Sequence, residues 1–505
     1  MDITLLIFLS SGLFLGWSLG ANDAANVFGT AVGSRMISFT TAALICTVFV
    51  ILGATISGAG AAHGLGKLGA LNALPGAFMA AFSAALTVFW MTKLGLPVST
   101  TQAVVGAIIG WNLFSGSITD IGVLTKIIAT WVACPLLGAA FGALLYSVTT
   151  RVIQWSDIHL LRLDSYVRLA LIFAGAFGAY SLGANNIGNV MGVFISSSPF
   201  TDVRIFDAFT FTSIQQLFLM GAIAIGVGVI TYSKRVMMTV GNSLMPLSPV
   251  AAWVVVIAHS VVLFLFSSIA LEHFLASNGL PTIPLIPVSS SQAVVGAVIG
   301  IGLLKGGKGI KWTVLGNISS GWVTTPIISA IICFVMLFFL QNVFNQKVYE
   351  EVYFELSDQE IAHLEQSGID TGSLHALKDK KIAKAVKFRE LLRKHTDLSD
   401  ADLGVVIETA EIYPIYIDED KASHADKNYL GEARFQALQA IIGETFNYKW
   451  QLYDALSKLS KDWQLKPKTK LNKAYNKQLK SRLGYLHNTF RLGEDGINNS
   501  KQFEG

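Results

Sequence analysis

Charged residues are scarce in this sequence: Asp, Glu, Lys and Arg make up 14% of its 505 residues, whereas 52% are hydrophobic. The scarcity is confined to the first part. Up to residue 344 there are 13 Lys and Arg and 8 Asp and Glu, against 24 and 25 afterwards. Apolar runs long enough to cross a bilayer, with charges in short loops between them, predict a multi-pass membrane protein surrounded by lipid. The overall charge of +4 is therefore no sign of nucleic-acid binding.

Cysteine is also rare, and catalytic patterns are missing. The three cysteines, Cys46, Cys134 and Cys333, lie in apolar runs without CxxC spacing, so we interpret them as small buried residues. No nucleophile–base pair or cluster of metal ligands is recognisable, so the sequence does not predict an enzyme. The first apolar run has no basic residues before it, and we interpret it as a retained helix.

Two motifs occur twice in the same order. PVSTTQAVVGAIIG (residues 97–110) returns as PVSSSQAVVGAVIG (residues 287–300), with eleven of fourteen positions identical. SLGANDAANVFG (residues 18–29) returns as SLGANNIGNVMG (residues 181–192). A duplicated membrane unit is typical of secondary transporters, whose substrate site lies where the halves meet.

The apolar runs predict two halves of five segments each. The first half is residues 1–150, followed by a charged linker (151–165), the second half (166–344) and a soluble, mainly helical C-terminal domain (345–505). An odd number of crossings per half predicts an inverted repeat. The fourth segments, which begin at Pro97 and Pro287, are short, and we expect broken or re-entrant helices there.

Loop charges predict the orientation in the membrane. Ten crossings with the N-terminus outside would leave ten basic residues in the inner loops and three in the outer loops, in agreement with the positive-inside rule. The tail would then lie outside the cytoplasm.

Within the tail, the spacing of Ser357 and Glu360 predicts a helix start. Residues 378–395 show a helical alternation of basic and apolar residues, which suits a solvated helix face or a membrane or partner contact. The end, from about residue 493, is expected to be disordered.

Asp23 is the one acid predicted to lie inside an apolar span. A carboxylate at that depth is costly and should have a partner or a function: a helix cap, a cation ligand or an acceptor for the substrate. Gly-rich sequence around it suggests an unwound helix whose oxygens would bind a hard cation such as sodium. In the second copy Asn186 replaces Asp23, and the asparagines there could also serve interhelical hydrogen bonding alone. The predicted sodium ligands are Asn22, Asp23, Asn26, Asn185 and Asn189.

The Pro-Val-Ser segments predict an anion site. Proline suits a helix start, the following hydroxyls suit its first turn, and free N–H groups at a helix N-terminus bind anions without Arg or Lys. None of the four motifs contains a basic residue. Ordinary capping and close helix packing are the alternative interpretation. The predicted anion-binding residues are Asp23, Ser99, Thr100, Thr101, Gln102, Asn186, Ser289, Ser290, Ser291 and Gln292.

The four motifs together resemble the inorganic phosphate transporter family. The resemblance covers residues 1 to about 344 and implies a phosphate symporter of the plasma membrane, coupled to sodium or protons, with inverted repeats and a homodimeric assembly. It also implies that the residues above contact phosphate and the coupling cation, and no other cofactor is expected. The family usually has Asp in both copies of the first motif, whereas position 186 here is Asn.

Two other functions stay open. Hydrogen phosphate can donate a hydrogen bond to a buried Asp23, whereas sulfate cannot, so phosphate is favoured over sulfate. A sulfate permease of related architecture is the first alternative. A phosphate-sensing receptor whose tail reports occupancy is the second. Sodium is preferred to the proton as the coupling ion.

Overall fold

A computed structural model describes residues 3–59, 68, 71–94, 97–197, 200, 203–205, 209–240, 245–278, 280–307, 309–423, 425, 427–467, 469 and 472–492. The predicted disorder beyond residue 493 lies outside this range. The chain forms two compact units. The membrane unit contains Met1–Phe114, Thr119–Glu272 and Thr282–Tyr349; the C-terminal unit contains Ser115–Ile118, His273–Pro281 and Glu350–Gly505.

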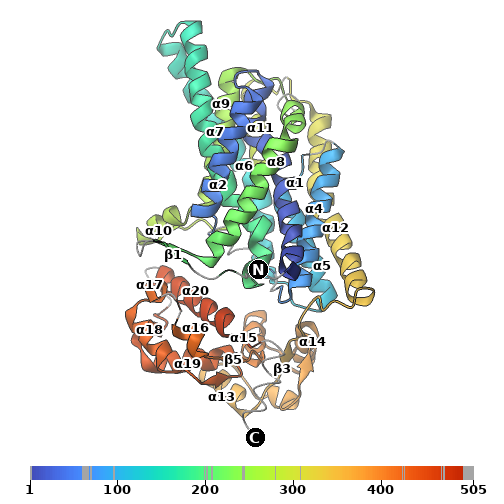
Figure 1. Cartoon of the computed structure of the whole chain (residues 1–505), viewed down its shortest axis with the longest axis vertical. Helices are drawn as coiled ribbons and strands as arrows, with labels where there is room; N and C mark the ends of the chain where they lie inside the picture. Colours follow the sequence, from blue (N-terminus) through green and yellow to red (C-terminus); the bar gives the residue numbers. More distant parts are fainter. Residues whose placement is uncertain are drawn as a thin grey trace. The chain divides into compact units, whose positions relative to one another are not determined.

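The membrane unit is a bundle of helices (Figure 1). Its first half comprises α1 (Ile3–Gly33), α2 (Phe39–Ser57), α4 (Leu74–Lys93), α5 (Thr100–Ser115) and α6 (Ile121–Trp155). Its second half comprises α7 (Leu160–Met191), η1 (Gly192–Ser197), the hairpin β1 (Val203–Ile205) and β2 (Phe209–Phe211), α8 (Ser213–Val240), α9 (Pro249–Ser267), α11 (Ser290–Leu304) and α12 (Trp312–Asn342). The helix α10 (Ile269–Ser277) begins in this unit, and its residues from His273 onward belong to the C-terminal unit.

Seven of the described helices are long and apolar enough to cross a membrane: α2, α4, α6, α7, α8, α9 and α12. The helix α1 has 31 residues, while α5 and α11 have only 16 and 15. A span requires about 20 helical residues, so α5 and α11 are the short helices predicted from the Pro-Val-Ser segments. The expected charged linker is mostly helical, because α6 continues to Trp155 and α7 already begins at Leu160.

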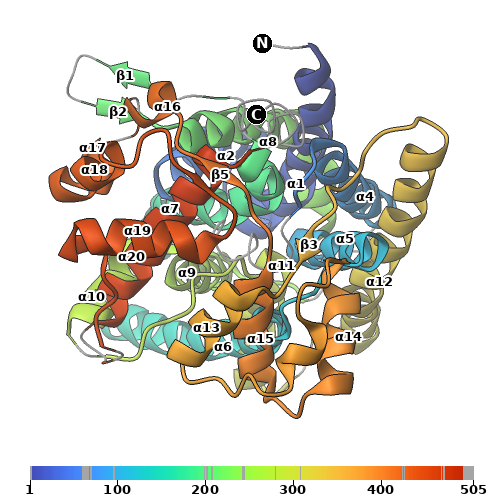
Figure 2. The same cartoon turned by 90° about the horizontal axis from the view of Figure 1, so that it is seen from below.

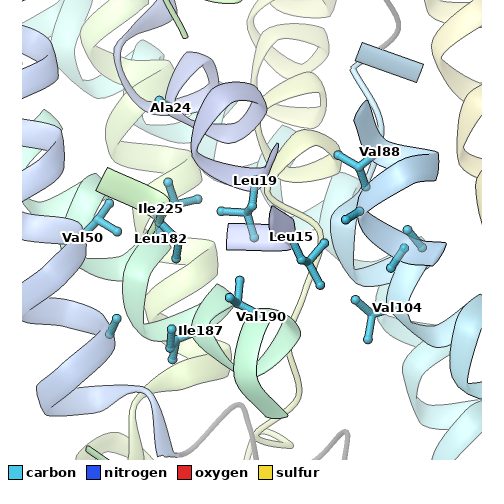
Figure 3. Packing of buried hydrophobic residues seen from close by; sticks show 14 of the residues in the cluster. Leu15, Leu19, Ala24, Val50, Val88, Val104, Leu182, Ile187, Val190 and Ile225 are labelled. Atoms are coloured by element: carbon cyan, nitrogen blue, oxygen red, sulfur yellow. The ribbon is translucent and has the colours of Figure 1, made fainter. Parts of the chain in front are cut away.

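Helices from the two halves pack against each other. The helix α1 contacts α8, α2 contacts α7, and α6 contacts α11. Figure 3 shows side chains of α1, α2, α7 and α8 gathered in one cluster, with Leu182 of α7 beside Ile225 of α8. The hydrophobic core of the membrane unit is therefore shared between the halves.

Motif glycines allow close approach of these helices. A Cβ at Gly20 of α1 would collide with the backbone oxygen of Ile225, and one at Gly183, the equivalent glycine of α7, would collide with that of Val50. The same duplication occurs in the second motif, where Gly106 and Gly296 lie against the backbone oxygens of prolines inside α12 and α6. The two halves thus repeat the same contacts. Their opposite orientation in the membrane stays a prediction.

The C-terminal unit is mainly helical. Its elements are β3 (Tyr353–Phe354), α13 (Asp358–Gln366), η2 (Leu374–Leu377), β4 (Ile382–Ala383), α14 (Ala385–His395), α15 (Asp400–Ala410), β5 (Ile415–Tyr416), α16 (Glu419–Ser423), α17 (Lys427–Leu430), α18 (Glu432–Gln439), β6 (Thr445–Phe446), α19 (Lys449–Leu459), η3 (Lys461–Trp463) and α20 (Lys473–Phe490). Strands pair as β3–β4 and β5–β6. Its core has two parts, one beneath α13–α15 and one beneath α18–α20, and these groups are separate in Figure 2.

Local sequence explains parts of this unit. Ser357 and Glu360 form the predicted capping box at the start of α13. The helix predicted over residues 378–395 is shorter than expected, because β4 pairs with β3 and α14 begins only at Ala385. In addition, the backbone N–H of Val386 donates to the oxygen of Gly116, so a short loop between α5 and α6 belongs to this unit.

Candidate functional site

The structure places all the predicted site residues inside the membrane unit. Each is at most 4% exposed. Ser99 and Ser289 precede α5 and α11, and their Oγ atoms accept the backbone N–H of Gln102 (3.4 Å) and Gln292 (3.2 Å). These are N-caps at helix ends that lie in the protein interior, where positive ends of helix dipoles attract anions.

Hydrogen bonds join the four motifs into one network. Asn186 of α7 donates to Asp23 Oδ2 of α1 (3.5 Å), and Asn189 of α7 donates to Thr101 Oγ1 of α5 (2.9 Å). Asn26 of α1 donates to Ser290 Oγ of α11 (2.9 Å). Segments up to 264 residues apart in sequence therefore meet at one place.

Asn185 fixes the segment that leads into α11. Its Nδ2 donates to the backbone oxygen of Val288 (2.8 Å), and its Oδ1 accepts the N–H of the same residue (3.0 Å). Both amide atoms of Asn185 are thus bonded to the protein. Asn185 holds the start of α11 in position. This corresponds to the interhelical hydrogen bonding that the sequence analysis gave as an alternative role for the asparagines of the second copy.

Asp23 lies on a continuous helix, contrary to expectation. The sequence predicted unwinding around Gly20–Gly29, but α1 is helical from Ile3 to Gly33, and α7 is helical through Asn186. Within the membrane every backbone N–H and C=O must be satisfied, and the helix does this without a break. Backbone carbonyls of α1 therefore do not supply cation ligands. The cation site predicted from the sequence therefore depends on side-chain oxygens.

Several buried side-chain atoms in this region have no hydrogen-bond partner among the described residues. They include donor groups, such as the Nδ2 of Asn22 and the hydroxyl of Thr100. They also include the acceptors Asp23 Oδ1, Asn189 Oδ1, and the Oε1 atoms of both glutamines, Gln102 and Gln292. Buried polar atoms without partners cost free energy, so a ligand with both acceptors and positive charge fits this set.

Asp23 is the only carboxylate in this set of residues. No group of three or more His, Cys, Asp or Glu that could hold a metal ion exists in the described part of the chain. Cation sites for Ca²⁺ usually combine several carboxylates, whereas one carboxylate with neutral amide oxygens balances a single positive charge. The site therefore suits a monovalent cation.

His259 of α9 was missed by the sequence analysis. It is fully buried, and its Nε2 lies 3.0 Å from Ser290 Oγ. The available signal was an ionisable residue within an apolar segment, the same signal that identified Asp23. The cysteines are buried as interpreted, and Cys134 Sγ donates to the backbone oxygen of Ser289 (3.3 Å).

Sequence comparisons find relatives of this chain among known proteins. The sequence model of the phosphate transporter family matches residues 19–333, with a further match over 275–446. A protein described as a "putative phosphate permease" from Methanocaldococcus jannaschii is 28% identical over 337 residues, covering 66% of this chain and 98% of that protein. Proteins with the same description from Thermococcus kodakarensis and Haemophilus influenzae are 25% and 23% identical; each alignment covers 66% of this chain and 97% or 96% of the relative.

One solved structure shares the fold. It is titled "The sodium-dependent phosphate transporter", superposes with a TM-score of 0.52 at 23% identity, and is covered completely by 66% of this chain. At this identity the likeness concerns the arrangement of helices.

Proposed function

Because this chain belongs to the phosphate transporter family, we propose that it imports inorganic phosphate by symport with a cation, and that the cation is sodium in preference to a proton. The chain is a multi-pass integral protein of the plasma membrane, and it is a transporter of phosphate, not an enzyme. The coupling ion, the binding residues and a homodimeric state are proposals.

The observation that carries the proposal is the convergence of the four motifs. Both short helices, α5 and α11, begin within the buried network, and their first turns provide N–H groups and hydroxyls. Two helix N-termini can stabilise an anion without a basic side chain. The phosphate ligands are those predicted from the sequence, and Thr100, Gln102 and Gln292 contribute groups that the described residues leave unpaired.

The cation site is proposed at Asp23. Its Oδ1 has no hydrogen-bond partner among the described residues, and amide oxygens of the same region offer further hard ligands. Asn22, Asn26 and Asn189 complete the set. Asn185 is a weaker candidate, because Val288 occupies both ends of its amide. Sodium is preferred because a site built of several oxygens suits the coordination of a hard metal cation. The solved structure with this fold is also titled sodium-dependent.

The same carboxylate favours phosphate over sulfate. Hydrogen phosphate has an O–H that can donate to an acceptor such as Asp23, whereas sulfate would only be repelled by it. A site without a free acceptor would suit sulfate better, so a sulfate permease is the alternative function. A receptor function would require no net movement of the anion.

Uptake into proteoliposomes tests the proposal. Purified protein is reconstituted, and labelled phosphate or sulfate is offered with an inward sodium gradient, an inward proton gradient, or neither. We expect concentrative phosphate uptake that depends on the sodium gradient. Uptake with the proton gradient alone would assign the proton instead. Sulfate uptake would support the permease alternative, and binding without uptake would support the receptor.

A further inference from the structure

We propose that His259 is a positioning residue: together with Asn26 it fixes the hydroxyl of Ser290 as a hydrogen-bond donor to the transported anion. This inference rests on the proposed phosphate site. It gives a role to a buried ionisable residue outside the four repeated motifs, and it assigns different tasks to the two halves of the molecule.

The geometry centres on a single hydroxyl. Ser290 is the first residue of α11, directly after the N-cap Ser289. Its Oγ lies 2.9 Å from Asn26 Nδ2 and 3.0 Å from His259 Nε2, so three helices (α1, α9 and α11) meet at this atom. All three residues are at most 4% exposed, so the hydrogen bonds of this hydroxyl are made within the protein interior.

The donors and acceptors available on each group limit the direction of these two hydrogen bonds. A serine hydroxyl has two acceptor lone pairs and one donor hydrogen. The amide N–H of Asn26 uses one lone pair. His259 either accepts the hydroxyl hydrogen at Nε2 or donates an N–H to the second lone pair, depending on the tautomer.

The other ring nitrogen selects the tautomer. His259 Nδ1 is buried and has no hydrogen-bond partner among the residues described. If Nδ1 carried the proton, a buried N–H would be left unpaired, and unpaired buried N–H donors are rarer than unpaired acceptors. Neutral His259 therefore carries its proton on Nε2 and donates it to Ser290.

The consequence is that Ser290 can only donate. Both lone pairs of its Oγ are occupied by Asn26 and His259, and the described side chains and backbone provide it with no other hydrogen bond. Its hydrogen needs an acceptor in the first turn of α11, where the positive helix end attracts an anion. An oxygen of the bound phosphate supplies that acceptor.

The described residues of the first half show no equivalent arrangement. Counted from the proline at the start of each helix, Pro249 of α9 and Pro75 of α4, His259 corresponds to Ala85. Thr100, which corresponds to Ser290 in the repeat, has no partner for its hydroxyl in the described structure. The first half thus contributes the charge of Asp23, and the second half contributes an oriented donor.

Three variants test this role in proteoliposomes under a sodium gradient, with the KM for labelled phosphate as the readout. His259→Leu removes the donor and retains a similar volume. His259→Gln places an amide N–H at a reach close to that of Nε2. Ser260→Ala is the matched control on the same helix, because the Ser260 hydroxyl bonds only within α9, to the oxygen of Val256.

We expect His259→Leu to raise the KM about fivefold with little change in maximal rate, as expected for one lost hydrogen bond. His259→Gln should return the KM to within about twofold of wild type, and Ser260→Ala should leave it unchanged. If His259→Leu does not insert, His259→Asn replaces it, because its shorter amide does not reach Ser290.

A double-mutant cycle decides whether His259 acts through Ser290. In a Ser290→Ala background, His259→Leu should raise the KM by less than about twofold, since the hydroxyl it positions is gone. A normal KM for His259→Leu, or effects that multiply in the double variant, would overturn the inference. Absence of phosphate uptake by the wild-type protein would instead refute the proposed function.

Discussion

Replacing Asp23 by Asn should uncouple phosphate uptake from sodium. The Asp23 carboxylate is 3% exposed, its Oδ2 has one amide donor at 3.5 Å, and its Oδ1 has no partner in the described region. A buried carboxylate with so little support must be neutralised, and the proposed partner is the sodium ion. Asn has the same shape, so the substitution removes a charge and leaves the packing of α1 intact.

The expected magnitude follows from the burial. Removing one partner of a buried charge pair costs about 3–5 kcal/mol, which corresponds to at least about a hundredfold loss of sodium affinity. At sodium concentrations that saturate the wild-type protein, uptake by Asp23→Asn should then fall to the level seen without sodium. Sodium should also raise the melting temperature of the wild-type protein in detergent and leave that of the variant unchanged.

A charge swap provides the control. Asn186 lies at the equivalent position of the repeat and contacts Asp23 directly. The double variant Asp23→Asn/Asn186→Asp moves the carboxylate from α1 to α7 within the same network, and it should regain part of the sodium dependence. Wild-type sodium dependence in a well-folded Asp23→Asn protein would refute the reasoning.

Three further predictions concern the hydroxyls, the helix contacts and the tail. Thr100→Ala should raise the KM for phosphate about tenfold and leave the melting temperature unchanged, because the lost hydroxyl has no partner in the described part of the protein; an unchanged KM would place the anion elsewhere. Gly296→Ala should destabilise the protein by about 1–3 kcal/mol, because its Cβ would strike the backbone of α6, whereas Gly316→Ala, with open space around it, should be neutral or stabilising; equal melting temperatures would contradict this packing. Ending the chain after Tyr349 should leave phosphate uptake largely intact, and loss of uptake with normal insertion would show that the C-terminal unit belongs to the mechanism.

The position of that truncation illustrates what composition alone misses. The shift in charge predicted a boundary near residue 345, but the membrane unit extends to Tyr349. The indole N–H of the buried Trp111 donates to the backbone oxygen of Val348 (3.1 Å), and Phe114 packs on Tyr349. A cut at 345 would leave the Trp111 donor unpaired. The sequence equally gives no sign that Ser115–Ile118 and His273–Pro281 belong to the C-terminal unit, because this assignment depends on long-range contacts.

The candidate site was more predictable than its details. Repeated motifs identified the four segments, and hydrogen bonds connect Asn189 to Asn186 and Asn186 to Asp23. A separate hydrogen bond connects Asn26 to Ser290. Glycine and asparagine around Asp23 wrongly suggested an unwound helix. The small residues instead allow close packing, and the helix keeps its backbone hydrogen bonds in the membrane.

His259 shows a different limit. An isolated histidine in an apolar helix has no sequence neighbour that reveals its role. Its partner Ser290 lies 31 residues away, and Asn26 belongs to the other half of the protein. Only the fold brings the three together, so the orientation of the Ser290 hydroxyl could not have been predicted from spacing or periodicity.

The central claim is that phosphate and a cation bind together at the network joining the four motifs. Equilibrium binding of labelled phosphate to the purified protein, in sodium and in choline buffer, tests it most directly. Sodium should tighten phosphate binding by about 5- to 150-fold, phosphate should tighten sodium binding by the same factor, and the factor should approach one in Asp23→Asn. Equal phosphate affinity in both buffers, or undiminished coupling in Asp23→Asn, would contradict the account.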